Sequence, residues 1–178
     1  MGNGILVCGL NGAGKSTLGH ALAQRIGYYF IDNEDLYFPK NDENYLFASP
    51  RTKLEVKSLL TAEIAEHENF VFASVIGNYG DDVISMFNTA VVIDAPKDIR
   101  LRRIKERSLS KFGDRMLPGG DLYEAENAFF DMVSGRDEGY VEDWLEILSC
   151  PVIRVDGTLP IEQNIERIIN EIYPEKLN

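Results

Sequence analysis

The sequence lacks the features that would place it in several common classes. It has only two cysteines, Cys8 and Cys150, and neither belongs to a cluster with metal-ligand spacing, which indicates buried thiols in a reducing compartment. No apolar run approaches the ~18 residues that a membrane-spanning helix needs. The first residues carry neither the charged segment of a secretory signal nor the pattern for N-myristoylation. We therefore expect a cytoplasmic protein with no membrane partner.

Positive charge is also scarce. Lysine and arginine total 18 against 29 aspartate and glutamate residues, which gives a formal net charge of −11. Because a nucleic-acid partner needs a basic surface, this balance argues against nucleic acid as the main partner. A local basic site for a small phosphorylated molecule is still compatible with it. The 178 residues, 44% of them hydrophobic, are enough for one domain with a full core.

The sequence does contain a glycine-rich loop, which follows the apolar run 5–8 and precedes a helical stripe through Ile26. Strand, loop and helix in this order are the context of the G-x-x-x-x-G-K-[ST] phosphate-binding motif. Glycines allow positive φ angles, and successive backbone N–H groups can then converge on an anion at the helix N-terminus. The motif predicts nucleoside triphosphate binding, with Lys15 on the β- and γ-phosphates and the Ser16 hydroxyl on Mg²⁺. The expected nucleotide-contacting residues are Asn11, Gly12, Ala13, Gly14, Lys15, Ser16 and Thr17.

Apolar runs alternate with helical patterns along the chain, which predicts an α/β fold: a parallel sheet with helices on both faces, in three layers. Five strands are expected, at 5–8, 28–31, 70–76, 90–93 and 152–155. The expected helices cover 16–26, 50–67, 82–87, 97–107, 121–133, 136–148 and 160–172. Ser49 followed by Pro50 is expected to start the second helix, and Asp121 to cap the fifth. We expect one domain over residues 1–178, with an acceptor-binding region at about 33–68 and an inserted lid at about 108–134.

Polar residues follow the predicted strands at the carboxyl edge of the sheet, where ligands bind in parallel α/β folds. Asp32 ends the second strand and could reach both Mg²⁺ and an acceptor hydroxyl, so a metal-binding and a catalytic role are predicted. Glu34 could contact the acceptor, as could Gly77 and Asn78 after the third strand. The alternative is structural: Asp32 would cap the next helical turn, and Glu34 would be solvated.

Five cations lie between residues 100 and 107. Arg103 and Arg107 are one helical turn apart and project from the same side. Arg115 follows in the predicted lid, and Arg136 opens the next helix. Because arginine binds phosphate bidentately and stacks on bases, we expect two of these four arginines to contact ligand. The alternative is a solvated face that balances the acidic total.

With these residues the chain resembles the nucleoside-monophosphate-kinase group of P-loop kinases, which includes adenylate, shikimate and gluconate kinases. Pro96, with Arg103 seven residues on and Arg107 eleven on, matches the start of that group's lid. The resemblance covers nearly the whole chain and implies the P-loop NTPase fold with a lid that closes over ATP. It implies that Arg103 lies against the adenine, that Arg107 reaches the phosphates, and that Arg115 completes the catalytic site from the lid.

Further segments extend the resemblance. The late loop with Gly157 and Thr158 resembles the segment whose backbone lies beside the adenine in this group. The run Asp32-Asn33-Glu34 resembles the paired acids of shikimate kinases, with glutamate in place of the second aspartate. Arg136 with Tyr140 resembles the arginine and tyrosine that follow the lid of shikimate kinases, which implies that Arg136 contacts the acceptor.

The acceptor half departs from the group's patterns. The Asp-Gly-Phe-Pro-Arg run of adenylate kinases and the triple glycine of shikimate kinases are both absent. Arg51 is the nearest candidate for a substrate-gripping arginine, and a surface charge at a helix start is an equal alternative. The aromatic residues between Tyr37 and Phe47 could hold a base or an apolar acceptor. The sequence therefore leaves the acceptor, the preference for ATP or GTP, and the oligomeric state open.

The expected function is an ATP-dependent kinase that uses Mg²⁺ to transfer the γ-phosphate to a small nucleotide or hydroxyl acceptor. The alternative from another class is a nucleotide-dependent switch or remodelling ATPase that acts on a protein. The chain has no Asn-Lys-x-Asp guanine-reading motif to support a GTPase switch, and no second helical domain to support a remodelling ATPase. A kinase acting on nucleic-acid ends is disfavoured by the acidic balance.

Overall fold

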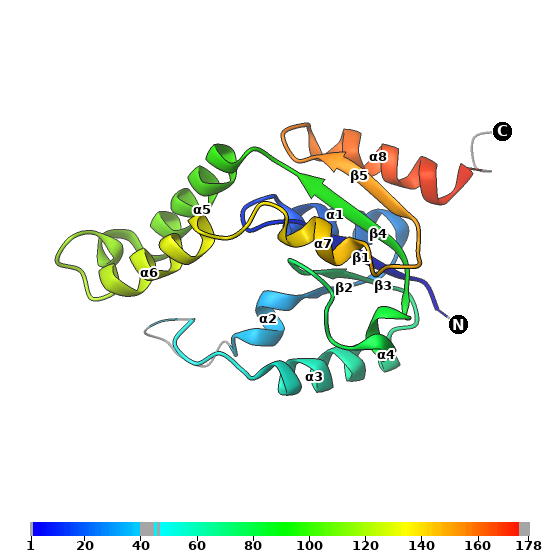
Figure 1. Cartoon of the computed structure of the whole chain (residues 1–178), viewed down its shortest axis with the longest axis horizontal. Helices are drawn as coiled ribbons and strands as arrows, with labels where there is room; N and C mark the ends of the chain where they lie inside the picture. Colours follow the sequence, from blue (N-terminus) through cyan, green and yellow to red (C-terminus); the bar gives the residue numbers. More distant parts are fainter. Residues whose placement is uncertain (1, 40–44, 46, 175–178) are drawn as a thin grey trace.

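A parallel sheet forms the centre of the protein, and the computed structural model describes residues 2–39, 45 and 47–174. Its strands are β1 (Gly4–Cys8), β2 (Tyr29–Asp32), β3 (Phe70–Ala73), β4 (Phe87–Asp94) and β5 (Val152–Asp156). They pair in parallel in the order β2-β3-β1-β4-β5 (Figure 1). The five-stranded parallel sheet that the alternating pattern predicts is therefore confirmed.

Helices connect the strands and cover both faces of the sheet (Figure 1). They are α1 (Lys15–Ile26), α2 (Asn33–Tyr37), α3 (Lys53–Glu66), α4 (Asp81–Ile84), α5 (Lys97–Phe112), the 3₁₀ turn η1 (Gly113–Met116), α6 (Tyr123–Ser134), α7 (Tyr140–Leu145) and α8 (Ile161–Ile172). No helix within the described ranges is long and apolar enough to cross a lipid bilayer.

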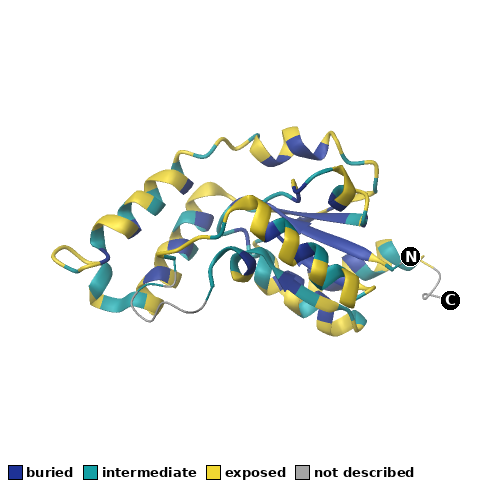
Figure 2. Cartoon of the chain, turned by 90° about the horizontal axis from the view of Figure 1, so that it is seen from below, coloured by how far each residue is buried: buried dark blue, intermediate teal, exposed yellow. Residues whose placement is uncertain are grey.

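The sheet is buried on both faces because neighbouring residues of a strand point to opposite sides. Leu6 and Cys8 of β1 pack with residues of α2, α3, α4 and α7, whereas Ile5 and Val7 pack with residues of α1 and α8. Every residue of β1 and β3 is buried, as expected for strands that read as continuous apolar runs. Figure 2 shows the buried strands at the centre and exposed residues on the outward sides of the helices.

The helix predicted from the Ser49-Pro50 pair starts later, so that prediction is wrong. α3 begins at Lys53, and Thr52 is its N-cap. The Thr52 hydroxyl accepts the N–H of Glu55 at 3.3 Å, and the Glu55 carboxylate accepts the N–H of Thr52 at 2.8 Å. This reciprocal pair satisfies two backbone donors. Ser49 cannot form it, because the third residue after Ser49 is Thr52 and not an acid.

The helices after η1 also differ from the prediction. Asp121 does not cap α6, because its carboxylate accepts two hydrogen bonds from the Arg115 guanidinium, at 3.0 and 2.6 Å. The helix predicted at 136–148 is reduced to α7. Its first part is a turn in which the Asp137 carboxylate accepts the N–H of Gly139 at 3.0 Å, and such local side-chain bonds compete with helix formation.

The boundaries of β3 and β4 matter for the site. β3 ends at Ala73 and not at residue 76, because its register partners in β1 and β2 are Val7 and Asp32, where both pairings stop. The chain after Ala73 is a loop, in which the Ser74 hydroxyl donates to the carbonyl oxygen of Ile76 at 2.8 Å. The helix predicted over 82–87 is shorter than expected. α4 is a single turn that ends at Ile84, and Phe87 is already the first residue of β4.

The region predicted as the lid extends from one end of the sheet, next to the segment that follows α2 (Figure 1). α5 continues without a break through Phe112, and η1 and α6 complete this arm. The Tyr45 hydroxyl donates to the carboxylate of Glu126 at 2.8 Å, and Glu126 is only 1% exposed. This bond joins the predicted acceptor-binding region to the lid helix α6. Residues 40–44 and 46 of the predicted acceptor-binding region lie outside the described residues.

Candidate active site

The glycine loop between β1 and α1 leaves the first turn of α1 open to a ligand. Gly12 and Gly14 have φ angles of 81° and 107°, in the region that residues with a Cβ rarely adopt. A Cβ at Gly12 would also overlap the carbonyl oxygen of Arg100. Gly14 is the N-cap of α1, and no side chain caps this helix. The backbone N–H groups of its first turn are therefore available to an anion.

Lys15 supplies positive charge at the loop. Within the described residues, its Nζ donates to the neutral carbonyl oxygen of Leu10, at 3.1 Å. Burial lowers the pKa of Lys15 to about 8, and the nearby Asp32 carboxylate offsets part of that shift. A buried ammonium group is costly unless negative charge compensates it. A bound polyphosphate would provide that charge, so the arrangement favours an anionic ligand.

Asp32 caps a helix and also lines a cavity. Its carboxylate accepts the N–H of Glu34 at 2.9 Å and so caps α2. It also lines a cavity together with Ser16. A hydroxyl and a carboxylate are hard oxygen donors that fit Mg²⁺, which usually keeps waters and substrate phosphates as its other ligands. In the part of the chain that the structure describes, no group of three or more His, Cys, Asp or Glu side chains could hold a metal alone.

A nucleotide-side cavity of about 270 Å³ lies at the start of α1. Arg103, on α5, lines it and connects α5 to the glycine loop and to the loop after β5. Its Nη2 donates to the carbonyl oxygen of Gly157 at 2.9 Å, and its Nη1 donates to that of Ala13 at 3.4 Å. The loop after β5 is shaped by Thr158, whose N–H and hydroxyl both donate to Asp156, at 2.8 and 2.6 Å. The residues that line this cavity are Gly12, Gly14, Lys15, Ser16, Thr17, Arg103, Ile104 and Arg107.

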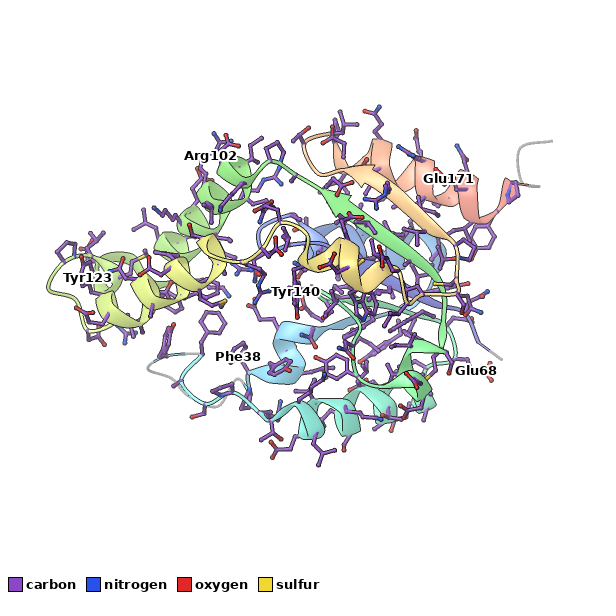
Figure 3. All side chains as sticks on the ribbon, in the orientation of Figure 1. Phe38, Glu68, Arg102, Tyr123, Tyr140 and Glu171 are labelled. Atoms are coloured by element: carbon purple, nitrogen blue, oxygen red, sulfur yellow. The ribbon has the colours of Figure 1, made fainter. Side chains whose placement is uncertain are left out.

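The resemblance implies that Arg103 lies against the adenine, and on that basis we expect Arg103→Ala to weaken Mg·ATP binding about tenfold. The base would lose a stacking surface, and the loop after β5 would lose the hydrogen bond that Arg103 donates to Gly157. Titration calorimetry with Mg·ATP measures this affinity. Arg102→Ala is the matched control, since the Arg102 side chain is 66% exposed and projects from the outer side of α5 (Figure 3). Equal affinities in the two variants would contradict the assignment.

An acceptor-side cavity of about 540 Å³ lies between the glycine loop, α2, the segment after α2, and α6. Its lining includes four charged residues and five aromatic residues. The lining residues are Asn11, Gly12, Lys15, Ser16, Asp32, Asn33, Glu34, Tyr37, Phe38, Tyr45, Phe47, Pro50, Ala73, Ser74, Val75, Arg107, Ala125, Ala128, Phe129 and Met132.

Glu34 connects this cavity to the lid and is not a solvated surface charge. Its carboxylate lies 3.4 Å from the guanidinium of Arg107 and 3.3 Å from Nζ of Lys111. Both partners are on α5. The ion pairs therefore hold Arg107 at the wall that it shares with the nucleotide-side cavity.

Arg136 lies close to the glycine loop but does not line either cavity. Its guanidinium donates to the side-chain oxygen of Asn11 at 2.9 Å. It also lies over the ring of Tyr140, 5.3 Å from the ring centroid. The arginine–tyrosine pair that the sequence suggests is therefore present in space, next to a residue that lines the acceptor-side cavity.

Other residues proposed from the sequence lie away from the cavities. Arg51 donates to a backbone carbonyl oxygen of α2 at 2.8 Å, and Arg115 pairs with Asp121 in the lid at 2.6 Å. Gly77 is buried against Phe87, where a Cβ would not fit, and Asn78 is exposed. The loop after β3 instead faces the acceptor-side cavity through residues 73–75.

The structure adds lining residues that the sequence analysis did not select. Ser74 and Val75 belong to an apolar run that reads as strand, and their place in a loop follows only from where β3 stops pairing. Phe129 and Met132 lie three residues apart on α6, and together with Ala125 they mark one face of that helix. That stripe was a visible signal, although it did not reveal what the face covers.

Comparisons with known proteins agree with this geometry. A family model described as an AAA domain matches residues 5–115. The Bacillus subtilis (strain 168) protein YqaC, described as uncharacterized, is 28% identical, and the match covers 96% of this chain and 97% of that one. A shikimate kinase of Prochlorococcus marinus (strain NATL2A) is 31% identical, over 82% of this chain and 74% of that protein. The solved shikimate kinase of Acinetobacter baumannii, in complex with shikimate, shares the fold with a TM-score of 0.57 at 15% identity, covering 99% of this chain and 96% of that one.

The family match extends over more than half of the chain, from β1 through α5 into η1, and includes the glycine loop. The sequence relatives with an assigned activity are kinases of the kind that the motif spacing suggested. The chain therefore belongs to this AAA-domain family of P-loop proteins and, within it, to the kinases similar to shikimate kinases, and it is a phosphotransferase.

Proposed function

We propose that this protein transfers the γ-phosphate of Mg·ATP to a hydroxyl group of a small molecule. The observation that carries the proposal is a shared wall: Gly12, Lys15, Ser16 and Arg107 line both the nucleotide-side and the acceptor-side cavity. Such residues hold and neutralise a transferring phosphoryl group. A triphosphate in the first cavity would thus present its terminal phosphate to the second.

Each part of the shared wall has a role in this proposal. The backbone N–H groups of the glycine loop and the Lys15 ammonium bind the β- and γ-phosphates, and Arg107 reaches the transferred group from the lid. The Ser16 hydroxyl and the Asp32 carboxylate would hold Mg²⁺, which would supply further positive charge to the phosphates when bound. The acceptor oxygen bonds to the γ-phosphorus as the bond to the β-phosphate oxygen breaks. ADP leaves, and Asp32 takes the proton of the acceptor hydroxyl.

The acceptor in this proposal is a small molecule and not a nucleic acid. The acceptor-side cavity of about 540 Å³ lies in the range typical of small-molecule sites. The chain has a formal net charge of −11, which opposes the approach of a polyphosphate backbone.

The test follows γ-phosphate-labelled ATP in the presence of Mg²⁺ and a panel of small alcohols. We expect ADP release to rise at least about tenfold with a suitable acceptor, and the label to move to that acceptor and not to water. A protein with no measurable affinity for Mg·ATP would contradict the proposal. Turnover that rises only when another protein is added would favour the nucleotide-dependent switch or ATPase.

A further inference from the structure

We infer that the phosphoryl acceptor is an uncharged alcohol built on a ring, with a nucleoside as its simplest class, and not a monophosphate or a carboxylate. The inference rests on the proposed function and deepens it, because it concerns the acceptor-side cavity of the same site. The charges of the lining residues, the contacts of the nearby cations and the aromatic walls each support it.

The charged residues that line the acceptor-side cavity leave no cation for an anionic acceptor. Among the described lining residues the cations are Lys15 and Arg107, and both also line the nucleotide-side cavity. The other charged lining residues, Asp32 and Glu34, are carboxylates. An acceptor with its own phosphate or carboxylate would be buried beside like charge, and burying an unpaired anion costs more than a hydrogen bond returns.

The cations around this cavity are engaged in other contacts. Nζ of Lys111 lies 3.3 Å from the Glu34 carboxylate. The guanidinium of Arg51 donates to a backbone carbonyl oxygen of α2, and that of Arg136 donates to a side-chain oxygen of the glycine loop, at 2.8 and 2.9 Å. None of these three cations lines the cavity in the described part of the chain. An anionic acceptor held in the cavity would therefore lie outside the lining positions of these three cations.

A cationic acceptor fits no better than an anionic one. The Glu34 carboxylate already pairs with two cations, Arg107 and Lys111. Asp32 is the remaining carboxylate in the lining, and it is the proposed base. A positive group placed there would compete with Lys15, and with the proposed Mg²⁺, for the Asp32 carboxylate. The balance of charge therefore favours a neutral acceptor.

The walls of the cavity suit a ring. The rings of Phe38 and Phe47 meet edge to face with centroids 4.9 Å apart, and those of Tyr45 and Phe47 meet at 5.6 Å. Phe38 lies at the end of α2 (Figure 3). The lid contributes Phe129 and Met132 to the same cavity. Aromatic and thioether surfaces bind a flat ring better than an open-chain polyol.

Asn33 contributes a side-chain amide to the cavity lining, and a hydrogen bond to its oxygen fixes the orientation of that amide. Its side-chain oxygen accepts the hydroxyl of Tyr79 at 2.6 Å, and Tyr79 is buried in the core below. Because that bond holds the amide oxygen, the NH₂ group is the part of the Asn33 amide left for a ligand in the cavity that it lines. A ring nitrogen or ring carbonyl oxygen, such as a nucleobase offers, is the matching acceptor.

The first test compares matched pairs that differ in charge: each common nucleoside against its 3′-monophosphate, which keeps the 5′-hydroxyl, and methyl shikimate against shikimate. Coupled ADP release gives kcat/KM for each member. We expect a nucleoside to be used at least about 100-fold better than its own monophosphate, because the described lining residues offer no separate cation for the extra charge. The intact protein is assayed, so the comparison includes Lys40, which lies outside the described residues.

Either of two results would overturn the inference: better use of a monophosphate or of shikimate than of its neutral partner, or normal Mg·ATP binding with no neutral ring alcohol phosphorylated. Absence of measurable Mg·ATP binding by the parent protein would instead contradict the proposed function. The two failures are therefore distinguishable.

The second test uses neighbouring phenylalanines of the lid helix. Phe129→Ala should raise KM for the nucleoside at least about tenfold and leave KM for ATP within about twofold, as expected for a lost base-stacking surface. Phe130→Ala is the matched control, because Phe130 does not line the cavity and its ring lies 5.8 Å from Nζ of Lys105. Equal increases in KM in both variants would show a merely structural role for Phe129 and would overturn the ring contact.

Discussion

Replacing Lys15 with methionine should abolish phosphoryl transfer and make the ligand-free protein more stable. Methionine keeps most of the length of the lysine side chain and removes its charge. The variant would lose the ammonium group that we propose to bind the β- and γ-phosphates, so we expect kcat/KM to fall by about 10³-fold or more. Mg·ATP affinity, measured by titration calorimetry, should fall with it.

The gain in stability follows from the lowered pKa of Lys15. Burial lowers this pKa from 10.5 to about 8, which means that the folded protein disfavours the charged form. The cost of burying the charge is present in full below about pH 8, and it disappears as the pH rises toward the pKa of the unfolded chain. At pH 7 we expect Lys15→Met to raise the free energy of unfolding by about 1–2 kcal/mol, a value reduced for partial solvent access.

Urea denaturation of the ligand-free protein at pH 7 and pH 10 measures this effect, and the difference between variant and parent should be smaller at pH 10. Lys97→Met is the control, because Lys97 is exposed at the start of α5. A Lys15→Met variant that binds Mg·ATP as the parent does, or that is less stable at pH 7, would contradict the assignment. In the parent, Mg·ATP affinity should also fall above about pH 8, as Lys15 loses its proton.

The glycine loop could be predicted from the sequence because its information is local. Glycine at positions 12 and 14 is required where φ is positive, and Lys15 and Ser16 follow at fixed spacing on the first turn of α1. The position of Asp32 could also be predicted, because a carboxylate at the end of a buried strand lies at the carboxyl edge of the sheet. The structural and functional readings of Asp32 were posed as alternatives, and the geometry shows that the carboxylate caps α2 while it lines the cavity.

The walls of the acceptor-side cavity could not be predicted in the same way, because they depend on long-range contacts. Glu34 pairs with Lys111, which is 77 residues away in sequence. The helical period indicates that Phe129 and Met132 share a face, but not that this face lines the same cavity as α2 and the glycine loop. The loop at Ser74 exists because neighbouring strands end, which is a property of the sheet and not of the run itself.

Replacing Asp32 with asparagine should reduce kcat by about 10²- to 10⁴-fold, the usual contribution of a positioned general base. Asparagine is the informative substitution because its side-chain oxygen can still accept the N–H of Glu34 and cap α2. The fold of the acceptor side should therefore persist, while the proposed base is lost. Mg·ATP affinity should change by only a few-fold, since the glycine loop and Lys15 remain.

Single-turnover and steady-state rates with the identified acceptor measure the effect on kcat, and Asp35→Asn is the matched control because Asp35 is exposed on the same short helix. A second readout separates charge from packing. Asp32 raises the pKa of Lys15, so Asp32→Asn should move the alkaline loss of Mg·ATP affinity to lower pH, which a purely structural role would not do. Full activity in Asp32→Asn would contradict the role of Asp32 as the base. Lost activity with an unchanged pH dependence of Mg·ATP affinity would mean that Asp32 is too far from Lys15 for both to act on the same phosphoryl group.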